Sequence, residues 1–127
     1  MKRRWEIVKD ILEHIEAGDL YDTIQDERHL QNLSISEDDY VGHIEIMEDA
    51  GIIRNCEVDR NMNGEIVRYS VLGVFITMQG HDLLDAMRDK SLWSQIKKKS
   101  LQTGISLSWE FIKAAIPVVI REIIEKP

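Results

Sequence analysis

The chain has 127 residues, 43% hydrophobic and 31% charged, which is the composition of one folded domain and not of a disordered segment. Its single cysteine, Cys56, excludes an intramolecular disulfide and a zinc site built from several cysteines. The net charge of −7 is uneven, because residues 19–51 carry ten acidic side chains and one basic one. No apolar run is long enough to span a bilayer and no signal peptide is apparent, so we expect a cytoplasmic protein that does not bind membranes.

The first predicted element is an amphipathic helix over residues 3–17, with Gly18 as its C-terminal stop. One face of this helix is apolar and consists of Trp5, Val8, Ile11, Leu12 and Ile15. Residues 19–35 are polar and irregular. Their pattern fits a helix, a strand or a loop, and the sequence does not decide among these.

A second helix is predicted to begin at Ser36, whose hydroxyl can cap the first turn together with Asp39, and to end at Gly51. The spacing places Tyr40, Ile44 and Met47 in its buried stripe. The residues predicted to face solvent include no lysine, arginine, asparagine or glutamine, and they are Glu37, Asp38, Val41, Gly42, Glu45, Glu48 and Asp49.

A β-hairpin is predicted next, around Asn61-Met62-Asn63-Gly64. The Asn-Gly pair tolerates the positive φ angles of a type I′ turn, which makes it a strong hairpin signal. The first strand lies within residues 52–60, and the return strand runs from Glu65 to about Val71, with Gly73–Ile76 extending it.

Three more helices complete the predicted chain. Thr77 caps a helix that runs to about Lys90, and residues 92–103 form another that Gly104 ends. The last begins at Ser106 or Ser108 and continues to the C-terminus, with Pro117 producing a kink or a break.

A helix-turn-helix followed at once by a hairpin predicts a mainly α fold with a small antiparallel β-hairpin, namely a winged helix-turn-helix with a C-terminal helical extension. Residues 1–90 would form the winged-helix domain, and residues 91–127 the extension packed on the same domain. The alternative is an irregular α-bundle with an isolated hairpin.

Several stretches resemble a family of short phage and bacterial proteins known as domain of unknown function 2513. The matching stretches are Met1-Lys2-Arg3-Arg4, residues 43–53 (HIEIMEDAGII), residues 77–89 (TMQGHDLLDAMRD), Leu92-Trp93 and residues 103–108 (TGISLS). The resemblance implies a winged-helix-like fold and a phage or mobile-element context. It implies no activity, and no functional residue is carried over from it.

Winged helices often bind DNA, but the predicted solvent face of the second helix is acidic and lacks the residue types that read base edges. Nucleic-acid binding would therefore fall to the hairpin. Its candidate residues are Arg54, Arg60, Asn61, Asn63 and Arg68. Acidic residues lie among them, so a solvated hairpin of mixed charge is the other interpretation.

The last helix carries apolar residues on two sides, more than a terminal helix needs to cover one core. Its candidate interface residues are Trp109, Phe111, Ile112, Ile116, Val119 and Ile123. Either a protein partner or a second copy of the chain covers the second side, or Leu92, Trp93 and Ile96 cover it within the monomer. We expect a protein-interaction or adaptor module. The alternative is a DNA-binding transcriptional regulator that uses the hairpin and basic patches.

The residues give no sign of catalysis. His14, His29, His43 and His81 are far apart in sequence and match no metal-ligand spacing, and no phosphate loop or nucleophile elbow occurs. We therefore expect a non-enzymatic protein with no catalytic residues, no metal and no cofactor. His43 is predicted to be a hydrogen-bonded histidine at the edge of the buried stripe.

Overall fold

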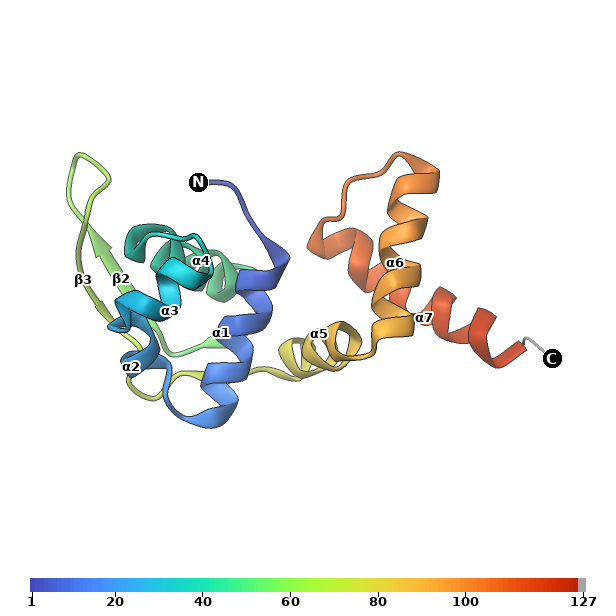
Figure 1. The fold of residues 1–127 in the computed structure, drawn as a ribbon, viewed down its shortest axis with the longest axis horizontal. Coiled ribbons are helices and arrows are strands. Elements are labelled where there is room, and N and C mark those ends of the chain that lie inside the picture. The colour runs from blue at the N-terminus through green and yellow to red at the C-terminus, as the bar shows by residue number, and fades with distance from the viewer. Residues whose placement is uncertain (126–127) are drawn as a thin grey trace. The chain divides into compact units, whose positions relative to one another are not determined.

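A computed structural model describes residues 1–125 of a mainly helical chain with small antiparallel two-stranded sheets (Figure 1). The chain divides into two compact units, Met1–His81 and Asp82–Pro127. The boundary lies inside the helix Met78–Arg88 and therefore earlier in the chain than the division after residue 90 that the sequence suggested. The packing of the C-terminal extension on the first domain stays a prediction.

α1 (Trp5–Ala17) confirms the first predicted helix. Gly18 ends it with a φ of 79°, a left-handed conformation that costs glycine little. The turn is closed by the amide of Asp19, which donates to the carbonyl of His14 at 3.0 Å. This end of α1 therefore holds the Asp19 backbone close to His14. The buried residues of α1 are Ile7, Val8, Ile11 and Leu12.

The segment that the sequence left open contains two short helices, α2 (Leu20–Ile24) and α3 (Glu27–Asn32). Asp26 caps α3, because its carboxylate accepts a hydrogen bond from the amide of His29 at 3.1 Å. Leu20, Ile24 and Leu30 are buried, and they anchor both helices to the core of the unit.

α4 (Glu37–Asp49) confirms the second predicted helix, and Ser36 caps it by accepting from the amide of Asp39 at 3.1 Å. Two residues correct the prediction of its solvent face: Val41 and Gly42 are buried. The reason is that α4 contacts α1 as well as the strand β2 (Glu57–Arg60). A helix covered by more than one neighbour has a wider buried surface than a single stripe.

The predicted hairpin is present as two antiparallel pairs. β1 (Ile53–Arg54) pairs with β4 (Phe75–Ile76), and β2 pairs with β3 (Ile66–Ser70), with an irregularity in register after Asp59. The predicted type I′ turn is wrong, because Gly64 has a φ of 80° whereas Asn63 does not adopt a positive φ. The side chain of Asn61 organises the turn instead, since its Oδ1 accepts from the amides of Asn63 and Glu65 at 2.9 and 3.0 Å.

α5 (Met78–Arg88) begins after Thr77, as predicted. The Thr77 hydroxyl accepts from the amide of Gly80 at 3.1 Å and lies within 2.6 and 2.9 Å of the carbonyl oxygens of Gly51 and Ile52. One side chain therefore caps α5 and joins its first turn to the segment that follows α4.

The second unit contains α6 (Lys90–Thr103) and α7 (Trp109–Glu125). Gly104 ends α6 in a left-handed conformation, as predicted, and Ser108 accepts from the amide of Phe111 at the start of α7. Pro117 lies inside α7 without a break in the helix. The prediction that this helix reaches the C-terminus includes residues 126–127, which lie outside the described residues. Among residues 1–125, no helix combines the length and apolarity needed to cross a membrane.

Candidate functional site

The hairpin β2–β3 lies against α4 within the first unit (Figure 1). Arg60 of β2 holds it there: its Nε donates to both carboxylate oxygens of Glu45, at 3.0 and 3.1 Å, and its Nη1 donates to the carbonyl of Gly64. Gly42 of α4 lies beside this ion pair and packs against Met1. If a methyl group were added at Gly42, it would lie 2.7 Å from the sulfur of Met1. The middle of α4, which would face a DNA groove in the predicted fold, is therefore covered by the chain itself.

Three of the other residues predicted to bind nucleic acid also have side-chain partners within the chain, whereas Asn63 contributes its backbone amide to the turn. Arg54 donates to the carbonyl of Glu48 at 2.9 Å, and Arg68 pairs with the carboxylate of Asp59 at 2.5 Å. Asn61 is used in the turn. Each of the three hairpin arginines thus donates to a carboxylate or a carbonyl, which reduces the number of donors available to a phosphate.

The predicted interface residues of α7 are divided between its two sides. Ile112 and Val119 are buried, Trp109, Phe111 and Ile116 are half-buried, and Ile123 is exposed. α6 packs on α7, and an ion pair of 2.8 Å between Lys99 and Glu122 joins the two helices. The large aliphatic residues of α7 that are exposed are Val118 (47%), Ile120 (41%), Ile123 (41%) and Ile124 (75%).

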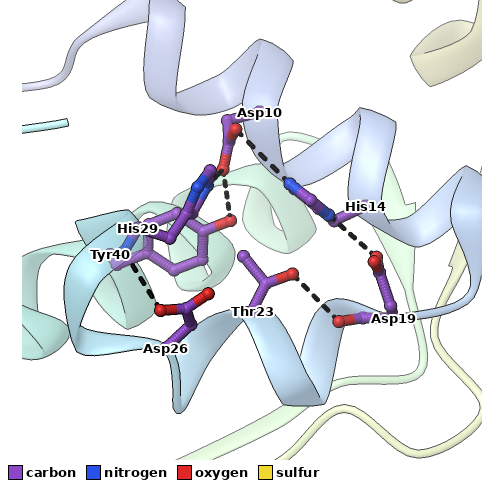
Figure 2. Close-up of polar contacts among 7 residues, drawn as sticks. All are labelled: Asp10, His14, Asp19, Thr23, Asp26, His29 and Tyr40. Atoms are coloured by element: carbon purple, nitrogen blue, oxygen red, sulfur yellow. Dashed lines mark hydrogen bonds and ion pairs between the residues drawn. The ribbon is translucent and has the colours of Figure 1, made fainter. Parts of the chain in front are cut away.

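A polar cluster joins three helices of the first unit, and sequence reasoning did not predict it (Figure 2). We call it the Asp10 cluster; its members are Asp10 and His14 of α1, Asp19, His29 of α3 and Tyr40 of α4. The Oδ2 atom of Asp10 accepts from the Tyr40 hydroxyl at 2.8 Å and lies 2.9 Å from Nε2 of His29. Its Oδ1 atom lies 3.6 Å from Nε2 of His14. A single carboxylate is therefore shared by groups from α1, α3 and α4.

Asp19 orients the second histidine of the cluster. Its carboxylate lies 2.8 Å from Nδ1 of His14, on the opposite side of the ring from Asp10 (Figure 2). Two contacts position the backbone of Asp19: the turn at Gly18, and the side-chain hydroxyl of Thr23, which donates to the Asp19 carbonyl at 3.0 Å. The His14 and His29 rings meet edge to face with their centroids 5.1 Å apart.

The Asp10 cluster is partly open to solvent. The side chains of Asp10, His14 and His29 are 16%, 26% and 28% exposed, whereas Tyr40 is fully buried. Burial and the adjacent Asp10 carboxylate both raise the pKa of the Tyr40 phenol, so Tyr40 acts as a hydrogen-bond donor. One ligand atom from each of Asp10, His14 and His29 can be chosen so that all three lie within 4.8 Å of one another. Such a set has the composition and spacing to hold a cation.

One sequence signal could have pointed to part of this cluster. Asp10 and His14 are four residues apart on a predicted helix and therefore share a face. His29 comes from the segment whose structure the sequence left open, so its approach to the pair could not be foreseen. The histidines looked scattered because α3 returns to α1 only in three dimensions.

Two other titratable groups are buried in the first unit. His43 has no exposed surface, its Nδ1 lies 2.7 Å from the Asp39 carbonyl, and its Nε2 accepts from the amide of Arg4 at 3.0 Å. The expected hydrogen-bonded histidine is therefore confirmed. The thiol of Cys56 donates to the Glu48 carboxylate at 2.7 Å.

Comparison with known proteins places the chain in a family. Residues 2–106 match the family described as "Hypothetical protein (DUF2513)", and the chain belongs to it. The chain is also 26% identical to a protein of Haemophilus influenzae (strain Rd) described as "Uncharacterized protein", over 98% of this chain and 99% of that one. No solved structure matches the chain.

Proposed function

We propose that this protein is a non-enzymatic protein-interaction module, built on a winged helix in residues 1–81, that pairs with a second copy of itself through α7. The order α1, α2–α3, α4 and then the long hairpin supports the winged-helix assignment. The exposed aliphatic side chains of α7 carry the functional part of the proposal, because contiguous exposed apolar surface marks interaction sites.

Two features of the first unit argue against DNA reading by α4. Val41 and Gly42 in its middle are covered, and the exposed side chains around them are acidic. DNA carries about one negative charge per 1.7 Å of its axis, so an acidic helix is repelled from it. Because α4 is covered in its middle and acidic around it, the module needs a surface other than α4 to bind its partner.

The geometry of α7 suggests another helix as that partner. Ile116, Ile120 and Ile124 follow one another at intervals of four residues and form one narrow apolar seam. Such a seam fits a second helix with the same spacing, which another copy of the chain provides. Val118 lies about 160° away from Ile120 around the helix axis and is not part of the seam.

The test is the molar mass of the full chain in solution, by light scattering after size exclusion. We expect twice the chain mass of 14.8 kDa at high concentration, and a monomer for the double variant Ile120→Lys/Ile124→Lys. Val118→Lys is the control, since it places a lysine on an exposed apolar site of α7 outside the seam and should leave the dimer intact. A wild-type chain that stays monomeric at millimolar concentration would overturn pairing between copies.

A gel-shift experiment at low salt separates this proposal from the DNA-binding alternative. We expect no shift of duplex DNA from the parent genome at micromolar protein. A shift that Arg54→Ala or Arg68→Ala abolishes would instead favour a regulator that uses the hairpin, and would count against the interaction module.

A further inference from the structure

We propose that Asp10, His14 and His29 form a binding site for a divalent transition-metal ion of the zinc class. The site would use one carboxylate oxygen of Asp10 and the Nε2 atoms of the two histidines. It would leave its remaining coordination position toward solvent, since all three side chains are partly exposed. Two nitrogens and one oxygen are a ligand set that zinc accepts readily.

The spacing of the ligand atoms agrees with this proposal. Zinc binds nitrogen and oxygen ligands at about 2.0–2.2 Å, so the ligand atoms of a tetrahedral site lie about 3.3 Å from one another. In the Asp10 cluster the Oδ2 atom of Asp10 lies 2.9 Å from Nε2 of His29, and its other oxygen, Oδ1, lies 3.6 Å from Nε2 of His14. One ligand atom from each residue already lies within 4.8 Å of the others, so an ion would be bound if the Asp10 carboxylate turned to bring one oxygen toward both histidines.

The hydrogen bonding of His14 gives a second, independent argument. Its Nδ1 faces the carboxylate of Asp19, which only accepts hydrogen bonds, so Nδ1 carries the proton. In the neutral ring the unprotonated Nε2 then points its lone pair at Oδ1 of Asp10. Two acceptors facing each other are unfavourable unless a positive charge lies between them. A bound metal ion would supply that charge and would engage His29 at the same time.

The surroundings of the three ligands also resemble those of a metal site. The Asp19 carboxylate that orients His14 is the kind of outer partner that metal-binding histidines ordinarily have. The hydroxyl of the buried Tyr40 holds Asp10 through Oδ2 and leaves Oδ1 directed at His14. Nε2 of His29 faces the Asp10 carboxylate and donates to it, so binding an ion through Nε2 would require the ring proton of His29 to move to Nδ1. The bound ion would fasten the short helix α3 to α1 and stabilise the first unit.

The proposal is tested by titrating the chelator-stripped full chain with Zn²⁺ in a calorimeter, and with Co²⁺ while the visible absorption is recorded. We expect one ion per chain, and cobalt bands typical of four-coordination. Asp19→Asn should weaken binding by about 10- to 100-fold, because it replaces the charged outer partner of His14 by a neutral amide and leaves the three ligands in place. His14→Gln and His29→Gln should each weaken it further. His81→Ala is the matched control, since this exposed histidine lies outside the cluster, and should bind like the wild type.

A measurement on the unmodified chain keeps the test independent of how the variants fold. The imidazole nitrogen resonances of His14 and His29 should shift on addition of Zn²⁺, while those of His43 and His81 stay in place. The proposal would be overturned if the chain took up no Zn²⁺ at millimolar metal. It would equally fail if binding were unchanged in folded His14→Gln and His29→Gln, or if only His81 responded. In those cases a proton on His14, and not a metal ion, separates the two acceptors.

Discussion

Arg60 and Glu45 form a bidentate ion pair that fastens β2 to α4. The Arg60 side chain is 37% exposed, whereas that of Arg68, which pairs with Asp59 within the hairpin, is 81% exposed. Fixed, partly covered ion pairs with two hydrogen bonds contribute more to stability than mobile surface pairs. We therefore expect Arg60→Ala to lower the midpoint of urea unfolding more than Arg68→Ala does. The exchanged pair Glu45→Arg/Arg60→Glu should recover part of the loss, and equal effects of the two alanine variants would contradict this role.

Gly80 packs directly on the backbone at the start of β1. A methyl group there would collide with the carbonyl oxygen of Ile52 and would lie 2.7 Å from a side-chain carbon of Ile76. Because a backbone carbonyl cannot turn away cheaply, Gly80→Ala should lower the free energy of unfolding by about 1–3 kcal/mol. Chemical denaturation measures the effect, and Gln79→Ala, at an exposed position of the same helix, is the control. A Gly80→Ala variant as stable as the control would show that this contact is not tight.

Cys56 should be unreactive in the folded protein. Burial, and secondarily the hydrogen bond to the Glu48 carboxylate, raise the pKa of its thiol to about 12. The reactive thiolate is therefore almost absent at pH 8. We expect an aromatic disulfide reagent to modify the native chain far more slowly than the chain in denaturant. Rapid, complete labelling without denaturant would contradict the buried, protonated thiol.

His43 should make the fold sensitive to acid. Burial lowers its pKa below the ordinary value of 6.5, so the folded state prefers the neutral ring, which the Arg4 amide and the Asp39 carbonyl hold. Above pH 6.5 the ring is neutral in both states and imposes no penalty. As the pH falls below 6.5 the unfolded state binds the proton first, and stability decreases.

The His43→Gln variant isolates this contribution, since it keeps a polar side chain at the site and removes the titration. Urea midpoints measured between pH 7.5 and 5 should fall less steeply with acidification in the variant than in the wild type. The other titrating groups are common to both proteins and cancel in the comparison. Parallel pH profiles would show that His43 is not the responsible group.

The sequence predicts the helices and the hairpin well because their signals are local. Gly18 and Gly104 end helices, Ser36 and Thr77 begin them, and an apolar spacing marks the faces in between. The turn at Asn63-Gly64 was assigned to the wrong type because the side chain of Asn61, two positions earlier, organises it. The burial of Val41 and Gly42 was missed for a non-local reason. Neither periodicity nor composition shows that the hairpin folds back onto α4.

The candidate site illustrates the same limit. Asp10 and His14 are visible as a pair from their spacing, but their partners come from three other places in the chain. His29 depends on the path of α3, and Tyr40 was recognised only as a core residue of α4. The partners of Arg60 and Arg68 also lie nine or more residues away. The sequence shows which residues are charged, but only the structure shows which of them form ion pairs with one another.

The sharing of one carboxylate by α1, α3 and α4 has a consequence for how the sequence of this unit can change. A substitution at Asp10 leaves the hydroxyl of Tyr40 and the ring of His29 without their acceptor at the same moment. Substitutions at these three positions should therefore be strongly non-additive. Once Asp10 is lost, a further change of Tyr40 to phenylalanine should cost little, or even restore stability. Relatives of this chain should accordingly keep or replace these side chains as a group.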